Sequence, residues 1–379
     1  MPIAKAMTSM LQSGPLIREA AATGNSRVLA TLLGPAYRGL IQQRGKIENA
    51  TELQVAHAVH FDWKYRREFP EMQRIYTAAK RSQWDAGSDL DWSISVDPQS
   101  PQQLLIPDSY VPPSTLPIWQ RLSPAERADQ RHAMLSWLLS QFLHGEQGAL
   151  FAACQCTEAV PWLDAKLFGG TQAVDEGRHV EAFHTYLSTK LERLYQINDN
   201  LYVIIDALIT DSRWDVKFLG MQIMVEGLAL GAFCSLRPGT QEPLLKEMLK
   251  LVITDEARHV HFGVLALKRF YKTELSEVER REREDWAFEV ALLLRSRFLA
   301  HEFYEDYYAH LMSRAAWDQL VLRSELMELF RRTMYKRLIP NLKAIGLLSD
   351  RVRPRYAELG LLVYEGGKAA PELAANDLL

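Results

Sequence analysis

The sequence predicts an all-α protein: a four-helix bundle with a long crossover connection and additional helices at both ends. The main observation is an internal repeat, in which Glu146 and the hexapeptide Asp175–Val180 (DEGRHV) are matched 80 residues later by Glu226 and Asp255–Val260 (DEARHV). In each copy, the isolated glutamate precedes the glutamate of the Glu-x-x-His motif by 30 residues. Because a helix rises about 1.5 Å per residue, this gap suits one helix, a short turn and the return along an antiparallel helix.

Six residues of the repeat are candidate metal ligands. The glutamate and histidine of each Glu-x-x-His motif lie three residues apart and therefore share one face of a helix. Two such hairpins packed face to face would gather four carboxylates and two imidazoles. Burying four carboxylates without a cation would be costly, whereas two divalent ions cancel their charge. A carboxylate–imidazole set without thiolates favours iron or manganese over structural zinc. The ligands are Glu146, Glu176, His179, Glu226, Glu256 and His259.

This ligand pattern resembles that of the ferritin-like di-iron carboxylate proteins, in which two helices carry one glutamate each and two carry Glu-x-x-His. The resemblance covers residues 135–267, and the segment 83–93 is similar to one in ribonucleotide reductase small subunits and their relatives. The resemblance implies two terminal sets, each with an isolated glutamate and a histidine, joined by bridging glutamates. The sets are Glu146 with His179 and Glu226 with His259, and the bridges are Glu176 and Glu256.

Four charged residues beside the ligands are candidates for positioning roles. Asp175 and Asp255 lie four residues before the two histidines, on the same side of their helices, and are candidate acceptors that orient an imidazole ring. Arg178 and Arg258 could pair with these aspartates and offset buried charge, or form surface ion pairs, and both alternatives stay open.

Other histidines fit the site poorly. A third Glu-x-x-His motif, Glu181 to His184, has no counterpart in the second copy, so we interpret it as surface sequence. His261 lies two residues past His259 on the opposite side of the helix, which does not favour a seventh ligand. Val252 stands where arylamine N-oxygenases, which this chain resembles in the repeat motif, carry an additional histidine.

The resemblance implies oxygen activation at a di-iron site. Phe183 stands where ribonucleotide reductase small subunits carry a radical tyrosine, and Leu230 stands where bacterial multicomponent hydroxylases carry a threonine, so neither role is favoured. We therefore predict an O2-dependent non-haem di-iron oxygenase or oxidase whose catalytic groups are the metal ligands. Its substrate would be a small organic molecule in a mostly apolar pocket adjoining Glu146 and Glu226, undergoing hydroxylation, N-oxygenation or desaturation.

Several alternatives remain open at this stage. A mixed Mn/Fe pair suits the same ligands. A ferritin- or rubrerythrin-like iron-oxidising or peroxide-scavenging protein is the alternative function, although the chain extends by over 100 residues before residue 121 and after residue 272. No Cys-x-x-Cys pair offers a second iron site, so electrons are expected from a separate reductase or ferredoxin-like donor. The fold class suggests a homodimer by analogy.

Composition limits the classes of partner. The 379-residue chain has a formal net charge of −3 at pH 7, so no global basic field points to nucleic acid. Its three cysteines lie in apolar helical sequence, which predicts reduced, buried thiols and a cytoplasmic protein. There is no continuous run of 18 apolar residues and no N-terminal secretory pattern, so no membrane span or signal is expected.

The chain divides into four regions that we expect to form one compact domain. Residues 1–120 would supply N-terminal helices and a Pro-rich wrapping segment, and 121–272 the ferritin-like core. Residues 273–365 would add accessory helices, and 366–379 a flexible tail. Residues 15–82 read as amphipathic helices, with 63–68 as a helix surface. The Pro-rich stretch 83–120 is expected to wrap the core, anchored by Trp84, Trp92 and Trp119.

Helix boundaries follow from capping and breaking residues. Ser123–Glu126 has the form of a capping box with Pro124 in the first turn, which predicts the start of the first metal helix. The crossover is expected over 195–213 with a short helix inside it. The third metal helix would run from about 215 to 239. Two further helical stretches are predicted over 276–312 and 316–345.

Overall fold

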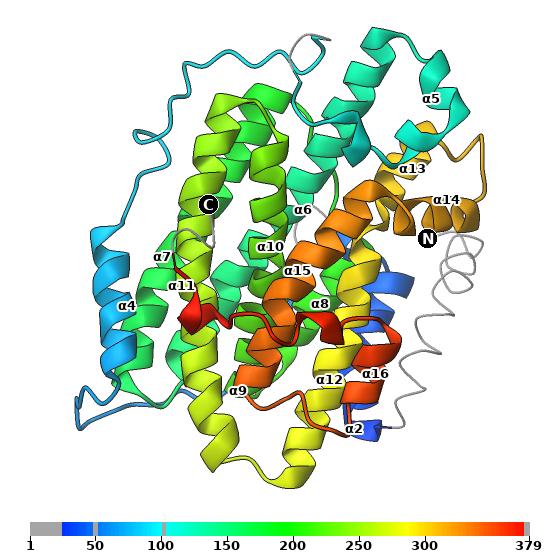
Figure 1. Ribbon diagram of the computed structural model, residues 1–379. Coiled ribbons are helices and arrows are strands. Elements are labelled where there is room, and N and C mark those ends of the chain that lie inside the picture. The colour runs from blue at the N-terminus through cyan, green and yellow to red at the C-terminus, as the bar shows by residue number, and fades with distance from the viewer. Residues whose placement is uncertain (1–24, 48–51, 101–103, 375–379) are drawn as a thin grey trace.

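The computed structural model describes residues 25–47, 52–100 and 104–374, and over these residues every regular element is a helix. The centre is a bundle of four long rods that lie side by side (Figure 1). The rods are α6 (Pro124–Ala159), α7 (Leu163–Tyr186), α9 (Trp214–Phe218) continuing through η5 (Leu219–Val225) into α10 (Glu226–Gly239), and α11 (Pro243–Thr273). The predicted all-α class and four-helix bundle are confirmed.

The first and last rods begin at strong caps. At α6, the Ser123 hydroxyl accepts from the Glu126 N–H at 3.2 Å, and the Glu126 carboxylate accepts from the Ser123 N–H at 2.7 Å. This is the predicted capping box. At α11, the Glu242 carboxylate accepts from the N–H groups of Leu244 at 2.8 Å and Leu245 at 2.6 Å. These contacts satisfy N–H groups that have no partner inside the helix.

The crossover contains the expected short helix, α8 (Asp199–Thr210), capped by Asn198. It packs against the outside of α6 and against η5. Lys217, on α9, is fully buried beneath it and donates to Gln155 Oε1 at 2.6 Å and to the carbonyls of Leu208 and Ile209 at 3.2 and 2.8 Å. The lysine thus binds free carbonyls at the end of α8 and fixes the crossover to the bundle.

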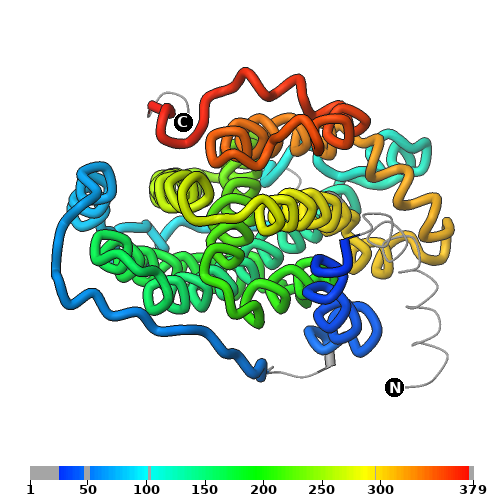
Figure 2. The backbone as a smooth tube through the Cα atoms, turned by 90° about the horizontal axis from the view of Figure 1, so that it is seen from below, coloured from blue at the N-terminus to red at the C-terminus, as the bar shows by residue number. Residues whose placement is uncertain are grey.

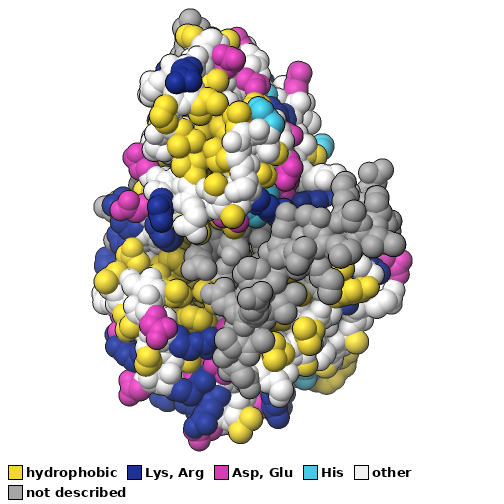
Figure 3. Space-filling view, turned by 90° about the vertical axis from the view of Figure 1, so that its right-hand side faces the viewer, with side chains coloured by type: hydrophobic (Ala, Val, Ile, Leu, Met, Phe, Trp, Pro, Cys, Tyr) yellow, Lys and Arg dark blue, Asp and Glu magenta, His cyan; other side chains and the backbone are white. Residues whose placement is uncertain are grey.

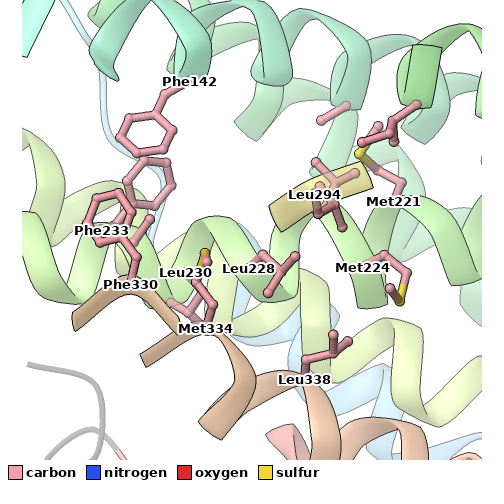
Figure 4. Packing of buried hydrophobic residues seen from close by; sticks show 14 of the residues in the cluster. Phe142, Met221, Met224, Leu228, Leu230, Phe233, Leu294, Phe330, Met334 and Leu338 are labelled. Atoms are coloured by element: carbon pink, nitrogen blue, oxygen red, sulfur yellow. The ribbon is translucent and has the colours of Figure 1, made fainter. Parts of the chain in front are cut away.

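The third rod has an apolar sequence because it lies at the centre. Trp214–Gly239 is long and hydrophobic enough to cross a membrane by length and composition, but 89% of its most apolar 18-residue window is buried inside the protein. Gly231 allows this rod to approach α15 closely, since an added Cβ would lie 2.8 Å from the Met334 backbone. Around this contact, Phe142, Phe233 and Met334 belong to one hydrophobic cluster (Figure 4).

Peripheral helices cover the bundle on several sides (Figures 1 and 2). They begin and end as follows: α2 Ser26–Ala36, η1 Tyr37–Ile41, α3 Arg44–Ile47, α4 Pro70–Arg81, η2 Asp108–Tyr110, η3 Pro112–Thr115, α5 Pro117–Arg121, η4 Leu187–Leu191, α12 Glu277–Ser296, η6 Arg297–Leu299, α13 His301–Tyr307, α14 Arg314–Leu322, α15 Glu325–Ala344, α16 Arg353–Glu358, η7 Leu362–Tyr364 and η8 Ala370–Glu372.

The helical prediction for residues 15–82 is wrong over 52–69, and its parts over 15–24 and 48–51 lie outside the described residues. Residues 52–69 run as an extended segment along the outside of the bundle (Figure 2). Polar contacts fix it there: Arg67 pairs with Asp164, and the N–H groups of Glu68 and Phe69 donate to the same carboxylate at 2.7 and 2.9 Å. Most of its apolar side chains are exposed, including Phe61 and Trp63, so it lacks the continuous buried face that stabilises an amphipathic helix.

The Pro-rich segment after α4 wraps the bundle as predicted, passing over one end of it to α5 (Figure 1). Trp84 and Trp119 are buried, and Trp92 packs at the edge of the core. The Trp119 Nε1–H donates to Asp108 Oδ2 at 3.1 Å, which joins two parts of the segment. Irregular backbone is stable here because buried tryptophans replace helical packing.

Three details at the C-terminal side and the surface differ from expectation. The stretches 276–312 and 316–345 are broken into shorter helices, and Ala300 at one break has φ 49°. In the expected tail, Ala370 is buried and its N–H donates to Asn341 Oδ1 at 2.8 Å, while 375–379 lie outside the described residues. Cys156 is buried, but Cys154 is exposed because it faces outward from α6.

The surface carries both signs of charge. On the face shown in Figure 3, Lys and Arg side chains are interspersed with Asp and Glu. This distribution agrees with the small net charge of the sequence.

Gly231→Ala should destabilise the protein by about 1–3 kcal/mol, because the new methyl group meets backbone that cannot move aside. The matched control is Gly227→Ala on the same helix, where an added Cβ meets nothing within 4 Å. Thermal unfolding of the metal-free proteins should show a lower midpoint for the first variant and an equal or higher midpoint for the second. Equal midpoints for both variants would contradict the close approach of α10 and α15.

Candidate metal centre

The structure brings all six predicted ligands together at the centre of the bundle. Each of the four rods contributes at least one of them. Ligand atoms of Glu146, Glu176, His179 and Glu256 lie within 4.8 Å of one another, and so do those of Glu176, Glu226 and His259. Glu176 belongs to both groups and could therefore bridge two ions, whereas Glu256, the other predicted bridge, belongs only to the first group.

The two imidazoles present the same nitrogen to the glutamates. Nδ1 of His179 lies 3.2 Å from Glu146 Oε2 and 3.3 Å from Glu256 Oε1. Nδ1 of His259 lies 3.0 Å from Glu176 Oε1 and 3.9 Å from Glu226 Oε2. Each histidine therefore faces one isolated glutamate and at least one glutamate of the repeat motif, in the pairing that the resemblance implies.

Several ligand atoms of these side chains have no hydrogen-bond partner and are therefore free to bind metal ions. All six residues are at most 5% exposed. Glu176 Oε2, Glu226 Oε2, both Glu256 oxygens and His259 Nδ1 are buried without a hydrogen-bond partner. Such atoms are costly inside a protein unless an ion or water satisfies them. Two divalent cations would use every one of them as a ligand and cancel the four carboxylate charges.

The electrostatics of the metal-free site agree with this view. Burial, and then the nearby Glu256, raises the pKa of Glu146 well above its usual range. Burial, and then Glu176, does the same to the pKa of Glu226. For His259, burial alone would lower the pKa, but the adjoining carboxylates, Glu176 first, raise it well above its usual value. Protons thus take the place of metal charge in the metal-free protein.

The aspartates of the repeat contact the histidines across the bundle. His179 Nε2 lies 3.2 Å from Asp255 Oδ2, and His259 Nε2 lies 3.3 Å from Asp175 Oδ2. The sequence predicts that these aspartates accept from imidazole, because each lies on the same side of its helix as the histidine that follows it. It does not predict that each aspartate contacts the histidine of the other copy. Because Nδ1 faces the glutamates, Nε2 points toward the neighbouring rod, where the other copy supplies the acceptor.

The first arginine of the repeat is buried with the aspartates rather than at the surface. Arg178 pairs with Asp175 and donates to Asp255 Oδ2 at 3.0 Å. It also donates to Gln83 Oε1 at 2.8 Å, and its guanidinium carbon lies 4.7 Å from the centre of the Trp84 ring. The Trp84 Nε1–H donates to Asp255 Oδ2 at 2.8 Å. The start of the wrapping segment therefore completes the polar layer behind the histidines.

The second arginine does the same from α11. Arg258 pairs with Asp255 and lies 3.9 Å from Asp175. Of the two open alternatives for these arginines, the structure has the one in which they offset buried aspartate charge. Two arginines and two aspartates then balance, which leaves the charge of the glutamates to the metal ions.

Gln172 is a site residue that sequence reasoning missed. Its Nε2 donates to Glu226 Oε1 at 2.9 Å and to Glu176 Oε1 at 3.1 Å, and its own carbonyl accepts from Gln222 at 3.3 Å. It holds one glutamate from each hairpin in place. Its position four residues before Glu176, on the same helix face, was a signal, but its repeat mate Val252 cannot donate.

A π-helical turn, η5, directly precedes Glu226. Such turns displace the register of a helix and are frequent at functional sites. The first copy has no such turn before Glu146, because α6 is α-helical throughout. The two isolated glutamates are thus placed by different backbone geometry, which the near-identical repeat could not indicate.

The face of the site away from the histidine–aspartate layer adjoins a small cavity. Its walls include Phe142, Val225 and Ala229, with Glu146, Glu226 and Glu256 at the site itself. Its free volume of about 10 Å³ is that of one water-sized molecule. A cavity does adjoin Glu146 and Glu226 at the predicted place, but it is far too small for an organic molecule, so the structure does not contain the predicted substrate pocket. Arg297, which sequence reasoning also missed, lines this cavity.

The remaining histidine predictions agree with the structure. Glu181 and His184 are exposed, as expected for a coincidental motif. His261 faces the charges of Glu71 and Arg74 on α4 and belongs to neither ligand group among the described residues.

Two antiparallel hairpins, α6 with α7 and α10 with α11, meet face to face and direct the six side chains inward. One glutamate stands on each of two rods and Glu-x-x-His on each of the other two. The fold is ferritin-like.

Comparisons with known proteins give one group of similar structures. No family model and no curated protein matches the sequence. Similar solved structures include a mutant R2-like ligand-binding oxidase with an anaerobically reconstituted Mn/Fe cofactor, at 19% identity, 76% coverage of this chain, 96% of that chain and a TM-score of 0.45. Another is an R2-like ligand-binding oxidase with an aerobically reconstituted metal cofactor after photoconversion, at 18% identity, with 70% and 93% coverage and a TM-score of 0.45.

Metal binding should release protons. The pKa values of His179 and His259 are raised well above their ordinary value, so both imidazoles hold protons at neutral pH and must lose them to bind a cation; the raised pKa values of Glu146 and Glu226 act in the same direction. The apparent affinity for Mn(II) should therefore rise as the pH increases from about 5 to 8. Calorimetric titrations in two buffers of different ionisation enthalpy would count the protons released, and a pH-independent affinity would contradict the electrostatics described above.

Proposed function

We propose that the protein is a di-metal oxidase or oxygenase that activates O2 and oxidises a small organic molecule. The observation that carries the proposal is the closed set of four glutamates and two histidines, with buried ligand atoms that have no other partner. Iron, or manganese with iron, suits this donor set. When bound, two such ions would supply the redox chemistry that no amino-acid side chain of the site offers.

The protein's own residues would create the conditions for that chemistry. The cavity beside the site has room for about one water-sized molecule, so access of bulk water to the site would be limited, which protects reactive oxygen species from side reactions. Asp255 and Asp175 hold the two imidazoles in one orientation and tautomer, and Gln172 holds Glu176 and Glu226. Hydroxylation, N-oxygenation and desaturation are all compatible with such a site, because pocket shape rather than ligand set selects among them.

Electron supply and assembly are part of the same proposal. The chain has no Cys-x-x-Cys pair that could form a second iron site, so a separate reductase or ferredoxin-like donor would deliver electrons. Homodimerisation is proposed from analogy with the fold class.

The ligand assignment predicts the effect of single substitutions. Glu176→Ala and His259→Ala should each abolish stoichiometric binding of two metal ions, because Glu176 serves both groups and His259 is the only imidazole of its group. Helicity should remain near that of the unmodified protein, as measured by circular dichroism. Glu181→Ala and His184→Ala are the matched controls, since they change the same residue types on the exposed side of α7. Elemental analysis showing full metal content in the first pair would refute the assignment.

The reaction class can be tested with the iron-loaded protein. Rapid mixing of the ferrous form with O2 should give O2 consumption that is accelerated by an organic substrate, with an oxidised product detectable by mass spectrometry. A screen of small carboxylic acids, amines and aromatics would identify the substrate class. Oxidation of added ferrous iron beyond two equivalents, with no organic product from any compound, would instead favour the ferritin-like iron-handling alternative.

A further inference from the structure

Arg297 is a buried cation beside the site that neither the ligand set nor the aspartate layer uses. It follows α12 in the short 3₁₀ helix η6 and is only 3% exposed. Ala300, three residues later, adopts a left-handed conformation with φ 49° and ψ 49°. A non-glycine residue rarely takes this conformation, so the chain accepts local strain where it turns Arg297 toward the bundle.

The charged groups that share the small cavity with Arg297 are Glu146, Glu226 and Glu256, which are carboxylates of the metal site. Across the part of the chain that the structure describes, Arg297 forms no ion pair and donates no hydrogen bond, although its side chain stacks 4.8 Å from the Phe298 ring. The other buried arginines among the described side chains are paired, as Arg178 is with Asp175 and Arg283 is with Asp215. A guanidinium offers five donors in a planar fork, and burial without acceptors is costly.

With both metal ions bound, the charges around the site would sum to one positive charge, which one anion would balance. Four glutamates are balanced by two divalent cations, and the two aspartates behind the histidines are balanced by Arg178 and Arg258. Arg297 then remains as one uncompensated positive charge at the wall of a water-sized cavity. A buried charge of this kind calls for a counter-ion, and the cavity is where that ion would enter.

We propose that Arg297 binds the carboxylate of the substrate, so that the enzyme acts on small carboxylic acids with an apolar body. This inference rests on the proposed function, because the surplus charge arises only when both metal ions are bound. Arg297 would act as a substrate-binding residue that places the acid beside Glu146 and Glu226. A carboxylate matches the planar fork of arginine with two parallel hydrogen bonds and adds one negative charge, which is the amount required.

The surroundings favour an apolar body on that acid. A second cavity, also of about 10 Å³, lies one turn away along α6 and is lined by Leu138, Phe298 and Phe330, among other residues. Leu138 and Phe142 are one helical turn apart, and Arg297 and Phe298 are consecutive, so neighbouring residues line the two cavities, although no residue lines both. Met134 and Met327 in the second cavity are flexible side chains that can adapt their packing. Movement of these walls would join both cavities into one elongated apolar pocket.

The test uses the full chain loaded with Mn(II) under anaerobic conditions and two fluorinated probes of equal shape. The probes are 3,3,3-trifluoropropionate, which is an anion, and 3,3,3-trifluoropropanamide, which is neutral. Binding is followed by the ¹⁹F relaxation of each probe, which the bound Mn(II) enhances only at short range. The unmodified protein should bind the anion at least tenfold more tightly than the amide.

Substitutions at Arg297 separate its role from direct coordination of the anion by metal. Arg297→Met keeps the length of the side chain without its charge and should weaken anion binding at least tenfold, with little effect on the amide. Arg297→Lys should give an intermediate affinity, because it keeps the charge but loses the fork. The matched control is Arg281→Met, an exposed arginine on the preceding helix α12, which should bind both probes like the unmodified protein.

Each outcome decides the inference. In the metal-loaded protein the charges of Glu146, Glu226 and Glu256 would be balanced by the metal ions, so Arg297→Met should not lower the thermal midpoint. Equal anion affinity in Arg297→Met and the unmodified protein, or equal affinity of the unmodified protein for anion and amide, would overturn the role of Arg297. If Arg297→Met fails to fold, the lysine variant and the anion–amide comparison still decide. Elemental analysis accompanies every sample: absence of bound Mn(II) would overturn the proposed function as well, whereas two bound ions without anion preference would overturn this inference alone.

Discussion

Four glutamates and two histidines meet at the centre of this bundle, where their charges cannot be solvated by water. The rest of the architecture follows from this constraint. Each ligand stands on a long rod, so that backbone polar groups are satisfied within the helices and none compete with the ligands. The free glutamate oxygens and His259 Nδ1 keep unsatisfied capacity in the metal-free protein, and that capacity is what makes two cations fit.

The two faces of the site are physically different although the repeat is nearly symmetric. Behind the histidines lies a polar layer in which Asp175 and Asp255 accept from the imidazole of the opposite copy and pair with arginines. This layer stiffens the imidazoles and is closed by Trp84 from the wrapping segment. In front of the glutamates lies a small cavity whose other walls are mostly apolar and which Arg297 also lines. Rigid ligands on one side and an adaptable, apolar space on the other are what substrate oxidation at a metal pair requires.

The additional helices enlarge the core and also serve the site. α12 and η6 deliver Arg297, and α15 packs so closely on α10 that only glycine fits at position 231. That contact holds α10, the helix that carries Glu226, in place. The wrapping segment after α4 reaches the arginine layer through Gln83. Parts of the chain outside the bundle therefore shape each face of the metal centre.

The sequence by itself determined the bundle, the six gathered residues and the start of α6 at Ser123. These features depend on local periodicity and on a repeat whose spacing is set by helix geometry. It did not determine which aspartate contacts which histidine, because that depends on how two distant rods face each other. Nor did it reveal the π turn before Glu226, the extended course of 52–69, or Arg297 at the cavity. Those features are decided by packing between segments far apart in the chain, where polar contacts and buried surface override local helical preference.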